Sequence, residues 1–187
     1  MAPLSLSFRI LGAVFHREAK PQVPRGVFPC PLPRRLSPLS QAALSCVARL
    51  SQELGTDILT LPVIYASRHG ELERTHALFQ EWAEFGEMSP AGFSLSVHNA
   101  TASLLGLACH NQNSSTTLAA GPETLQMGLL ETLMISRDSG PCLFVYGDCH
   151  PSLQAAALVL EHGSGSTRNL PDNLEALEAL WISESHP

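Results

Sequence analysis

The sequence predicts an α/β domain whose mostly parallel sheet is covered by helices on both faces. Two observations lead to this prediction. Short apolar runs that suit buried strands alternate with longer stretches in which apolar residues recur at helical spacing. The chain has 187 residues, which is the size of one ordinary domain and makes two independent domains improbable on size alone.

The first predicted helix follows a proline-rich segment, 1–33. Proline removes a backbone donor and fixes φ, so this segment allows little more than one strand, at 4–15. Ser37 can then cap a helix, Pro38 suits its first turn, and apolar residues recur at helical spacing until Gly55 ends it.

The middle of the chain repeats the order of strand, turn and helix. Residues 59–66 form an apolar, partly β-branched run that suits a buried strand, and residues 71–85 have one apolar helical face. A serine-proline pair then breaks the chain. The segment 93–100 follows and leads into a helix of small residues that ends near Cys109.

The last elements follow a polar loop at 110–115. They are a strand at 116–120, a tight turn at 121–123, an apolar helix at 124–135, and strands at 142–146 and 154–161. The tail begins with a flexible Gly-Ser-Gly-Ser stretch and contains a short helix at 174–182, for which we expect no place in the core. The domain organisation predicted is therefore a proline-rich N-terminal segment, 1–33, an α/β domain, 34–161, and a C-terminal tail, 162–187.

The charge of the chain argues against a nucleic-acid partner. Eleven basic residues face seventeen acidic ones, the net charge is −6, and Lys20 is the single lysine. A phosphate backbone needs clustered cations, which this composition does not supply. Hydrophobic residues make up 44% of the chain and charged residues 15%, so we expect part of the apolar surface to meet another protein.

Cysteine usage and the N-terminus indicate a cytoplasmic protein. The N-terminus lacks a basic region, Arg9 interrupts its apolar residues, and no apolar run reaches about 18 residues, so we expect neither a signal peptide nor a membrane span. Five cysteines without CxxC spacing suit a reducing compartment. We expect no metal at Cys109-His110 or Cys149-His150, since adjacent side chains on a strand point to opposite faces.

Two segments could carry chemistry. The strand, turn and helix at 116–135 have the arrangement with which condensing enzymes and hydrolases present a nucleophile, but the turn Gly121-Pro122-Glu123 holds neither serine nor cysteine. Ser96 and His98 could form a catalytic dyad. A structural role explains the segment better: serine and asparagine cap the helix that starts near residue 100, and His98 hydrogen-bonds to backbone groups. The Gly-Ser-Gly-Ser stretch matches no phosphate-binding motif, and we expect no cofactor.

Five blocks of the sequence carry a family resemblance: LPRRLSPLSQAAL at 32–44, ASRHGEL at 66–72, SPAGFSLSVHNA at 89–100, LAAGPET at 118–124 and GLLE at 128–131. In these blocks the chain resembles the β-ketoacyl synthase-like N-terminal domain, and more narrowly the short chain-length-factor subunits of bacterial aryl polyene biosynthesis. The resemblance implies a thiolase-like fold, of which this chain has the first of two similar halves.

The same resemblance implies a function without catalysis by the isolated chain. Complete ketosynthases carry their cysteine at the strand-turn-helix and take two histidines from the second half, whereas here the turn is Gly121-Pro122-Glu123. The implied role is that of a chain length factor that forms a heterodimer with a full-length β-ketoacyl-ACP synthase and shapes its acyl tunnel in polyketide or fatty-acid-like biosynthesis. An acyl carrier protein is a further partner that the resemblance allows.

Bulky side chains between residues 79 and 99 are the candidates for the interface and the tunnel. They are Phe79, Trp82, Phe85, Met88 and Phe93, with Ser96, His98 and Asn99 beside them. The alternative for each aromatic side chain is that it fills the local core. Two other functions stay open: an independent acyl hydrolase or acyltransferase that uses Ser96, Glu123 or a cysteine, and a stand-alone scaffold that binds a carrier protein.

Overall fold

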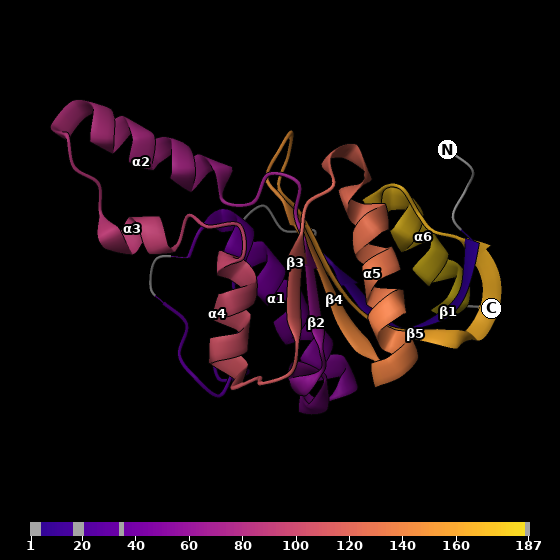
Figure 1. Ribbon diagram of the computed structural model, residues 1–187. Coiled ribbons are helices and arrows are strands. Elements are labelled where there is room, and N and C mark those ends of the chain that lie inside the picture. Colours follow the sequence, from indigo (N-terminus) through magenta and orange to yellow (C-terminus); the bar gives the residue numbers. More distant parts are fainter. Residues whose placement is uncertain (1–4, 17–20, 34–35, 186–187) are drawn as a thin grey trace.

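The computed structural model describes residues 5–16, 21–33 and 36–185, which form a five-stranded sheet covered by helices (Figure 1). The strands lie in the order β1-β5-β4-β2-β3. Strand β2 is parallel to β3 and to β4, whereas β5 is antiparallel to β4 and to β1. The sheet is therefore mixed, and its parallel part comprises three strands. The strands are β1 Ser5–Phe15, β2 Val63–Ala66, β3 Ser115–Leu118, β4 Cys142–Asp148 and β5 Gln154–Asn169.

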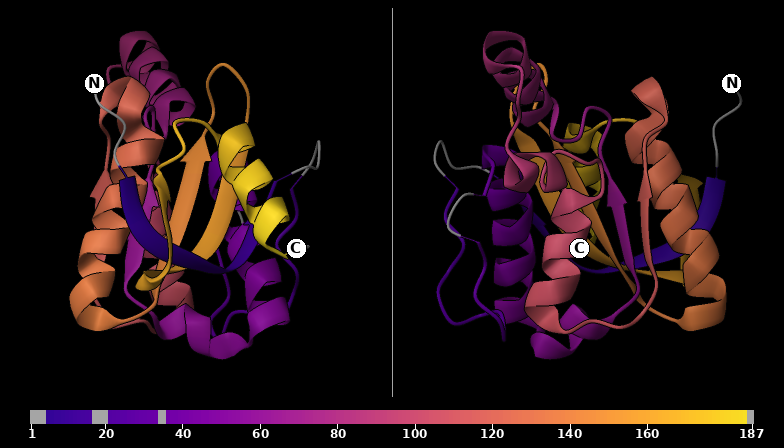
Figure 2. Two further views of the ribbon diagram at one scale, coloured as in Figure 1. Left: turned by 90° about the vertical axis from the view of Figure 1, so that its right-hand side faces the viewer. Right: turned by 60° about the vertical axis from the view of Figure 1, so that its left-hand side comes forward.

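Helices cover both faces of the sheet, as the sequence predicts (Figure 2). On one face lie α1, Pro38–Leu54, and α4, Ala100–Cys109; on the other lie α5, Thr124–Ser139, and α6, Leu174–Ser185. Successive residues of a strand point to opposite faces, so Ile64 belongs to the core under α5 and α6 while Tyr65 belongs to the core under α1 and α4. The α/β architecture is confirmed.

Helix α1 begins and ends where the sequence predicts. The Ser40 backbone N–H donates to the Ser37 hydroxyl at 3.0 Å, Pro38 lies in the first turn, and Gly55 follows the last residue with φ 98°. Such a positive φ is accessible to glycine at little cost, which is why the helix can end there.

Three local expectations in the middle of the chain need correction. The strand expected at 59–66 is shorter, because a 3-10 helix, Thr56–Thr60, and then Pro62 come before β2. A short helix, α3 (Pro90–Ser94), lies where only a chain break was expected, and Ser89 caps it through the Gly92 N–H. Helix α5 runs four residues past the expected end at 135.

The expectation that the tail has no place in the core is wrong. Strand β5 continues through the glycine-serine stretch to Asn169, so the expected boundary at residue 161 falls inside it. After the strand, Leu170 and Leu177 are buried against the sheet, and Leu177 has no exposed surface. Arg168 of β5 also pairs with Glu184 of α6. The tail therefore completes one face of the domain.

Helix α2, Leu72–Phe85, and helix α3 stand out from one end of the sheet (Figure 1). The two helices contact each other, with the Leu78 side chain close to Gly92, and Leu78 is the buried residue of α2. We call residues 72–94 the arm. Of the sequence features used above, Leu4, Lys20, Arg34 and Arg35 lie outside the described residues. No helix in the described ranges is long and apolar enough to cross a membrane.

Candidate functional site

The turn between β3 and α5 carries no nucleophilic side chain at its apex. Gly121–Glu123 forms one 3-10 turn, and Glu123 is exposed. The hydroxyl of the next residue, Thr124, is engaged twice: it accepts from the Ala120 N–H at 2.9 Å and donates to the Gly121 carbonyl at 2.7 Å. The start of α5 thus presents backbone N–H groups at a helix N-terminus, as a nucleophile turn does. The turn itself supplies no nucleophilic side chain beside them.

A histidine and an aspartate meet beside this turn, and the sequence did not predict the pair. His69 Nδ1–H donates to the Asp148 carboxylate at 2.9 Å, and Asp148 is buried. His69 follows β2 and Asp148 ends β4, so the pair lies at the shared carboxyl end of parallel strands. A polar residue at or shortly after the end of each of two apolar strands is the signal that could have found it. Asp148 also lines a cavity of about 350 Å³ together with Gly121 and Arg68.

Cys149 lies next to this pair but is a weak nucleophile. Burial raises the pKa of its thiol, and the negative charges of Asp148 and Glu73 raise it further. The thiol donates to the Gly70 carbonyl at 3.7 Å. A thiol that keeps its proton does not attack a carbonyl, because the thiolate is the reactive species.

Ser96 and His98 do not form the dyad considered from the sequence. The Ser96 hydroxyl donates to the Phe93 carbonyl at 2.8 Å, and His98 Nε2–H donates to the Ser67 carbonyl at 2.7 Å. The structural explanation of His98 is therefore confirmed. Gly70 makes room for this imidazole, since a Cβ there would lie 2.7 Å from His98 Cδ2. The expected side-chain cap from Asn99 is absent, although Asn99 does hold the position before α4.

A buried carboxylate fixes the base of the arm. Glu71, directly before α2, accepts from the Ser37 hydroxyl at 2.7 Å and from the Ser40 hydroxyl at 2.9 Å. Because Ser40 gives its one proton to Glu71, it accepts from Thr101 of α4, at 2.8 Å. Arg74 adds a longer contact to Glu71, at 3.5 Å. These contacts join α1, α2 and α4 at the point where the arm leaves the domain.

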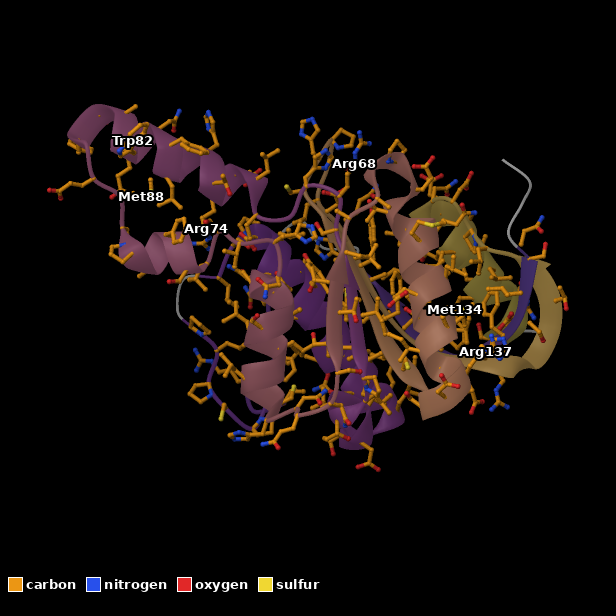
Figure 3. All side chains as sticks on the ribbon, in the orientation of Figure 1. Arg68, Arg74, Trp82, Met88, Met134 and Arg137 are labelled. Atoms are coloured by element: carbon orange, nitrogen blue, oxygen red, sulfur yellow. The ribbon has the colours of Figure 1, made fainter. Side chains whose placement is uncertain are left out.

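The aromatic side chains of the arm face away from the core. Phe79 is 59% exposed, Trp82 55%, Phe85 67% and Phe93 57%, so the alternative that these four residues fill the local core is wrong. Figure 3 places Trp82 and Met88 together at the end of the arm that is farther from the sheet.

Four of the candidate residues gather around one small cavity between α2 and α3. Its volume is about 90 Å³, and its lining includes Phe79, Met88, Phe93 and Ser96. Trp82 and Phe85 lie beyond it along α2, whereas His98 and Asn99 lie at the junction with α4. The structure thus divides the predicted set into an apolar group on the arm and a structural group at its base.

Metal ligands do not cluster in the described part of the chain. No group of three or more His, Cys, Asp or Glu residues there has the arrangement to hold a metal ion. Of the two pairs considered from the sequence, His110 instead contacts Cys30, and His150 stacks edge-on with the His69 ring at 5.4 Å between centroids.

Comparison with known proteins identifies the family. Residues 13–158 match the model of the β-ketoacyl synthase N-terminal domain. The chain belongs to this family. No protein of curated function matches the chain significantly.

Solved structures confirm the ketosynthase-type, thiolase-like fold of this family member. One similar chain comes from the complex of the ketosynthase ApeO with its chain length factor ApeC from Xenorhabdus doucetiae, with a TM-score of 0.73, 24% identity, and coverage of 97% of this chain and 93% of that chain. A β-ketoacyl synthase from Burkholderia phymatum STM815 gives a TM-score of 0.57 and 15% identity over 75% of this chain and 47% of that chain. The family member described here therefore corresponds to about half of that synthase.

Proposed function

We propose that this chain is a chain-length-factor-like subunit without catalysis of its own, which forms a heterodimer with an active β-ketoacyl-ACP synthase and shapes its acyl tunnel. The observation that carries the proposal is the apolar, exposed surface of the arm, formed by Phe79, Trp82, Phe85 and Phe93. The product class that we infer from the sequence resemblance is an aryl polyene or a related polyketide.

The arm presents more aromatic surface than a free domain of this size needs. Phe79, Trp82 and Phe85 lie within a third of a turn of each other around α2, and these three side chains and Phe93 of α3 are each more than half exposed. Contiguous aromatic surface of this kind is typical of a protein interface. The hydrogen bonds of Glu71 hold the base of the arm, so little ordering is needed on binding, which favours affinity.

The free edge of the sheet supports docking beside the arm. Strand β3 is the last strand of the order and pairs with β2 along one side. Its other side offers backbone donors and acceptors to a partner strand. The arm and β3 both lie on the side of the sheet away from β1 and β5 (Figure 1). A synthase that docks there would contact both.

The chemistry of the turn supports a role without condensation. Gly121, Pro122 and Glu123 offer no activated nucleophile, and the nearby Cys149 thiol keeps its proton. Ser96 donates its proton to a backbone carbonyl rather than to an imidazole. An independent acyl hydrolase at these residues is therefore the weaker hypothesis.

The cavity between α2 and α3 supports a role in limiting chain length. Met88 and Phe93 line it, and both are bulky apolar side chains that a growing acyl chain could meet. A tunnel ends where such side chains leave no room, since close-packed interiors do not admit further methylene groups. We expect the arm to supply part of that end.

Co-expression with a β-ketoacyl-ACP synthase from the same organism tests the proposal. We expect the two proteins to co-purify, and we expect Met88→Ala, which enlarges the cavity between α2 and α3, to lengthen the products measured by mass spectrometry while the heterodimer persists. Leu107→Ala, on an exposed apolar residue of α4, is the matched control and should leave the products unchanged. The proposal fails if the proteins never co-purify and the synthase makes the same products without this chain.

A further inference from the structure

A thiol and an imidazole meet at the side of the domain, away from the turn and the arm. Cys30 Sγ lies 3.0 Å from His110 Nε2, although the residues are far apart in the sequence. Backbone contacts hold both of them. The Cys30 N–H donates to the Ala108 carbonyl at 2.9 Å, and His110 ends α4 with φ 52° while its N–H points back to the Leu107 carbonyl. The end of α4 therefore sets the distance between them.

Of the two residues, Cys30 opens onto a cavity of about 540 Å³. Val23, Phe28, Leu32 and Leu36 supply its apolar lining and pack against the core under α1 and α4. Cys30 itself is part of the lining, and Arg25 adds a cation. This volume and composition fall within the range of sites that bind small apolar ligands with a few polar groups.

The other four cysteines lack this combination of features. Cys46, Cys109 and Cys142 are buried, and burial raises the pKa of Cys109 and of Cys142 to about 11. Cys149 is partly exposed, but burial and neighbouring carboxylates raise its pKa as well. A thiol with an imidazole at hydrogen-bond distance is the arrangement in which cysteine acts as a nucleophile.

We propose that Cys30 is a nucleophilic thiol, assisted by His110, that accepts an acyl group with an apolar tail from an activated ester or thioester. In this step the Cys30 sulfur attacks the acyl carbonyl, and its proton passes to His110 Nε2. The bond between the carbonyl carbon and the leaving oxygen or sulfur then breaks. The imidazolium returns the proton to the leaving group, so the products are an S-acyl Cys30 and a free alcohol or thiol, with no oxidant or further reactant. The apolar tail occupies the cavity.

Acylation of the purified chain with p-nitrophenyl hexanoate tests this proposal without any partner protein. We expect one equivalent of nitrophenol and one acyl group, which peptide mapping by mass spectrometry places on Cys30. Cys30→Ser should abolish the adduct. His110→Asn should slow its formation at least about tenfold, since proton transfer by a positioned side chain contributes about a hundredfold or more. Asparagine tolerates the left-handed backbone of residue 110, so this variant is expected to fold.

His76→Asn, which removes an exposed imidazole on α2, is the matched control and should react as fast as the wild-type chain. Peptide mapping of the acylated wild-type chain is enough to overturn the proposal. It does so if the acyl group appears on Cys149 or is spread over several residues. An unchanged rate in folded His110→Asn would overturn the role of the imidazole. Because the arm and the turn take no part, failure here would leave the proposed heterodimer untouched.

Discussion

Trp82→Ala isolates the contribution of the arm to heterodimer formation. Trp82 is 55% exposed. A large aromatic side chain buries up to about 250 Å² in an interface, so its exposed part offers about 140 Å², or about 3.5 kcal/mol at about 25 cal/mol per Å². Measured losses at aromatic hot spots start at about 2 kcal/mol. We therefore expect the dissociation constant for the partner ketosynthase to rise about 30- to 300-fold, as 1.4 kcal/mol is about tenfold.

Isothermal titration calorimetry of each variant against the ketosynthase measures this change directly. Because nearly half of Trp82 is buried in the free chain, urea unfolding of each variant accompanies the titration, and binding is compared at a temperature at which both variants are folded. Ile182→Ala is the control: Ile182 is 51% exposed on α6, on the opposite face of the sheet from α1 and α4. If folded Trp82→Ala binds as tightly as Ile182→Ala, the arm is not the docking surface.

Four further predictions concern stability, and urea or thermal unfolding checks each of them. Gly128→Ala should lower the free energy of unfolding by about 1–3 kcal/mol, because a Cβ there would lie 2.6 Å from Ala66 Cβ. Gly106→Ala should instead raise it by up to about 1 kcal/mol, since the nearest atom to a Cβ lies 4.0 Å away, and equal effects would contradict this packing argument. Leu177→Ala should cost about 2–5 kcal/mol if the tail belongs to the core, and a loss below about 1 kcal/mol would contradict that placement. Burial raises the pKa of Cys142 from 9.0 to about 11, so the folded state keeps a proton that the unfolded state loses. The contribution of this thiol to the free energy of unfolding is complete below about pH 9 and is lost as the pH rises to about 11, which lowers the stability by about 2 kcal/mol. The Cys142→Ala variant should lose less stability over that pH range. Equal losses in the two proteins would refute the assignment to Cys142.

Local sequence signals predicted the elements that depend on local chemistry. Ser37 and Gly55 bound α1 because a cap and a left-handed glycine act within one turn of the helix. The start of β2 was less predictable, since apolar residues before Pro62 suit a strand and a 3-10 turn equally well. The tail was predicted worst. Its glycine-serine stretch has no strand propensity of its own and has no partner in β1, but the residues on either side of it do pair with β1, His162 with Phe8 and Thr167 with Ser7.

The candidate site likewise has features that the local sequence predicts and contacts that it does not predict. The absence of a nucleophile between residues 121 and 123 was readable from the sequence, because one turn contains the whole motif. The contact between His69 and Asp148 was not, since 79 residues separate the two side chains and the parallel pairing of β2 with β4 brings them together. The same applies to Cys30 and His110, which meet because the N-terminal segment crosses the end of α4. Spacing in the sequence cannot reveal contacts that only the sheet and the helix ends create.

The arm has a buried, hydrogen-bonded base and an exposed aromatic surface, and this contrast indicates its function. Glu71 is buried and receives hydrogen bonds from two serines, which leaves the helix that follows rigidly placed. Exposed aromatic side chains on a loosely attached helix would collapse onto the domain to escape water. On this arm they stay exposed, because the buried base holds α2 away from the sheet and Leu78 is the one residue of α2 that is buried. An apolar surface kept open at such a cost in hydration favours a permanent protein partner.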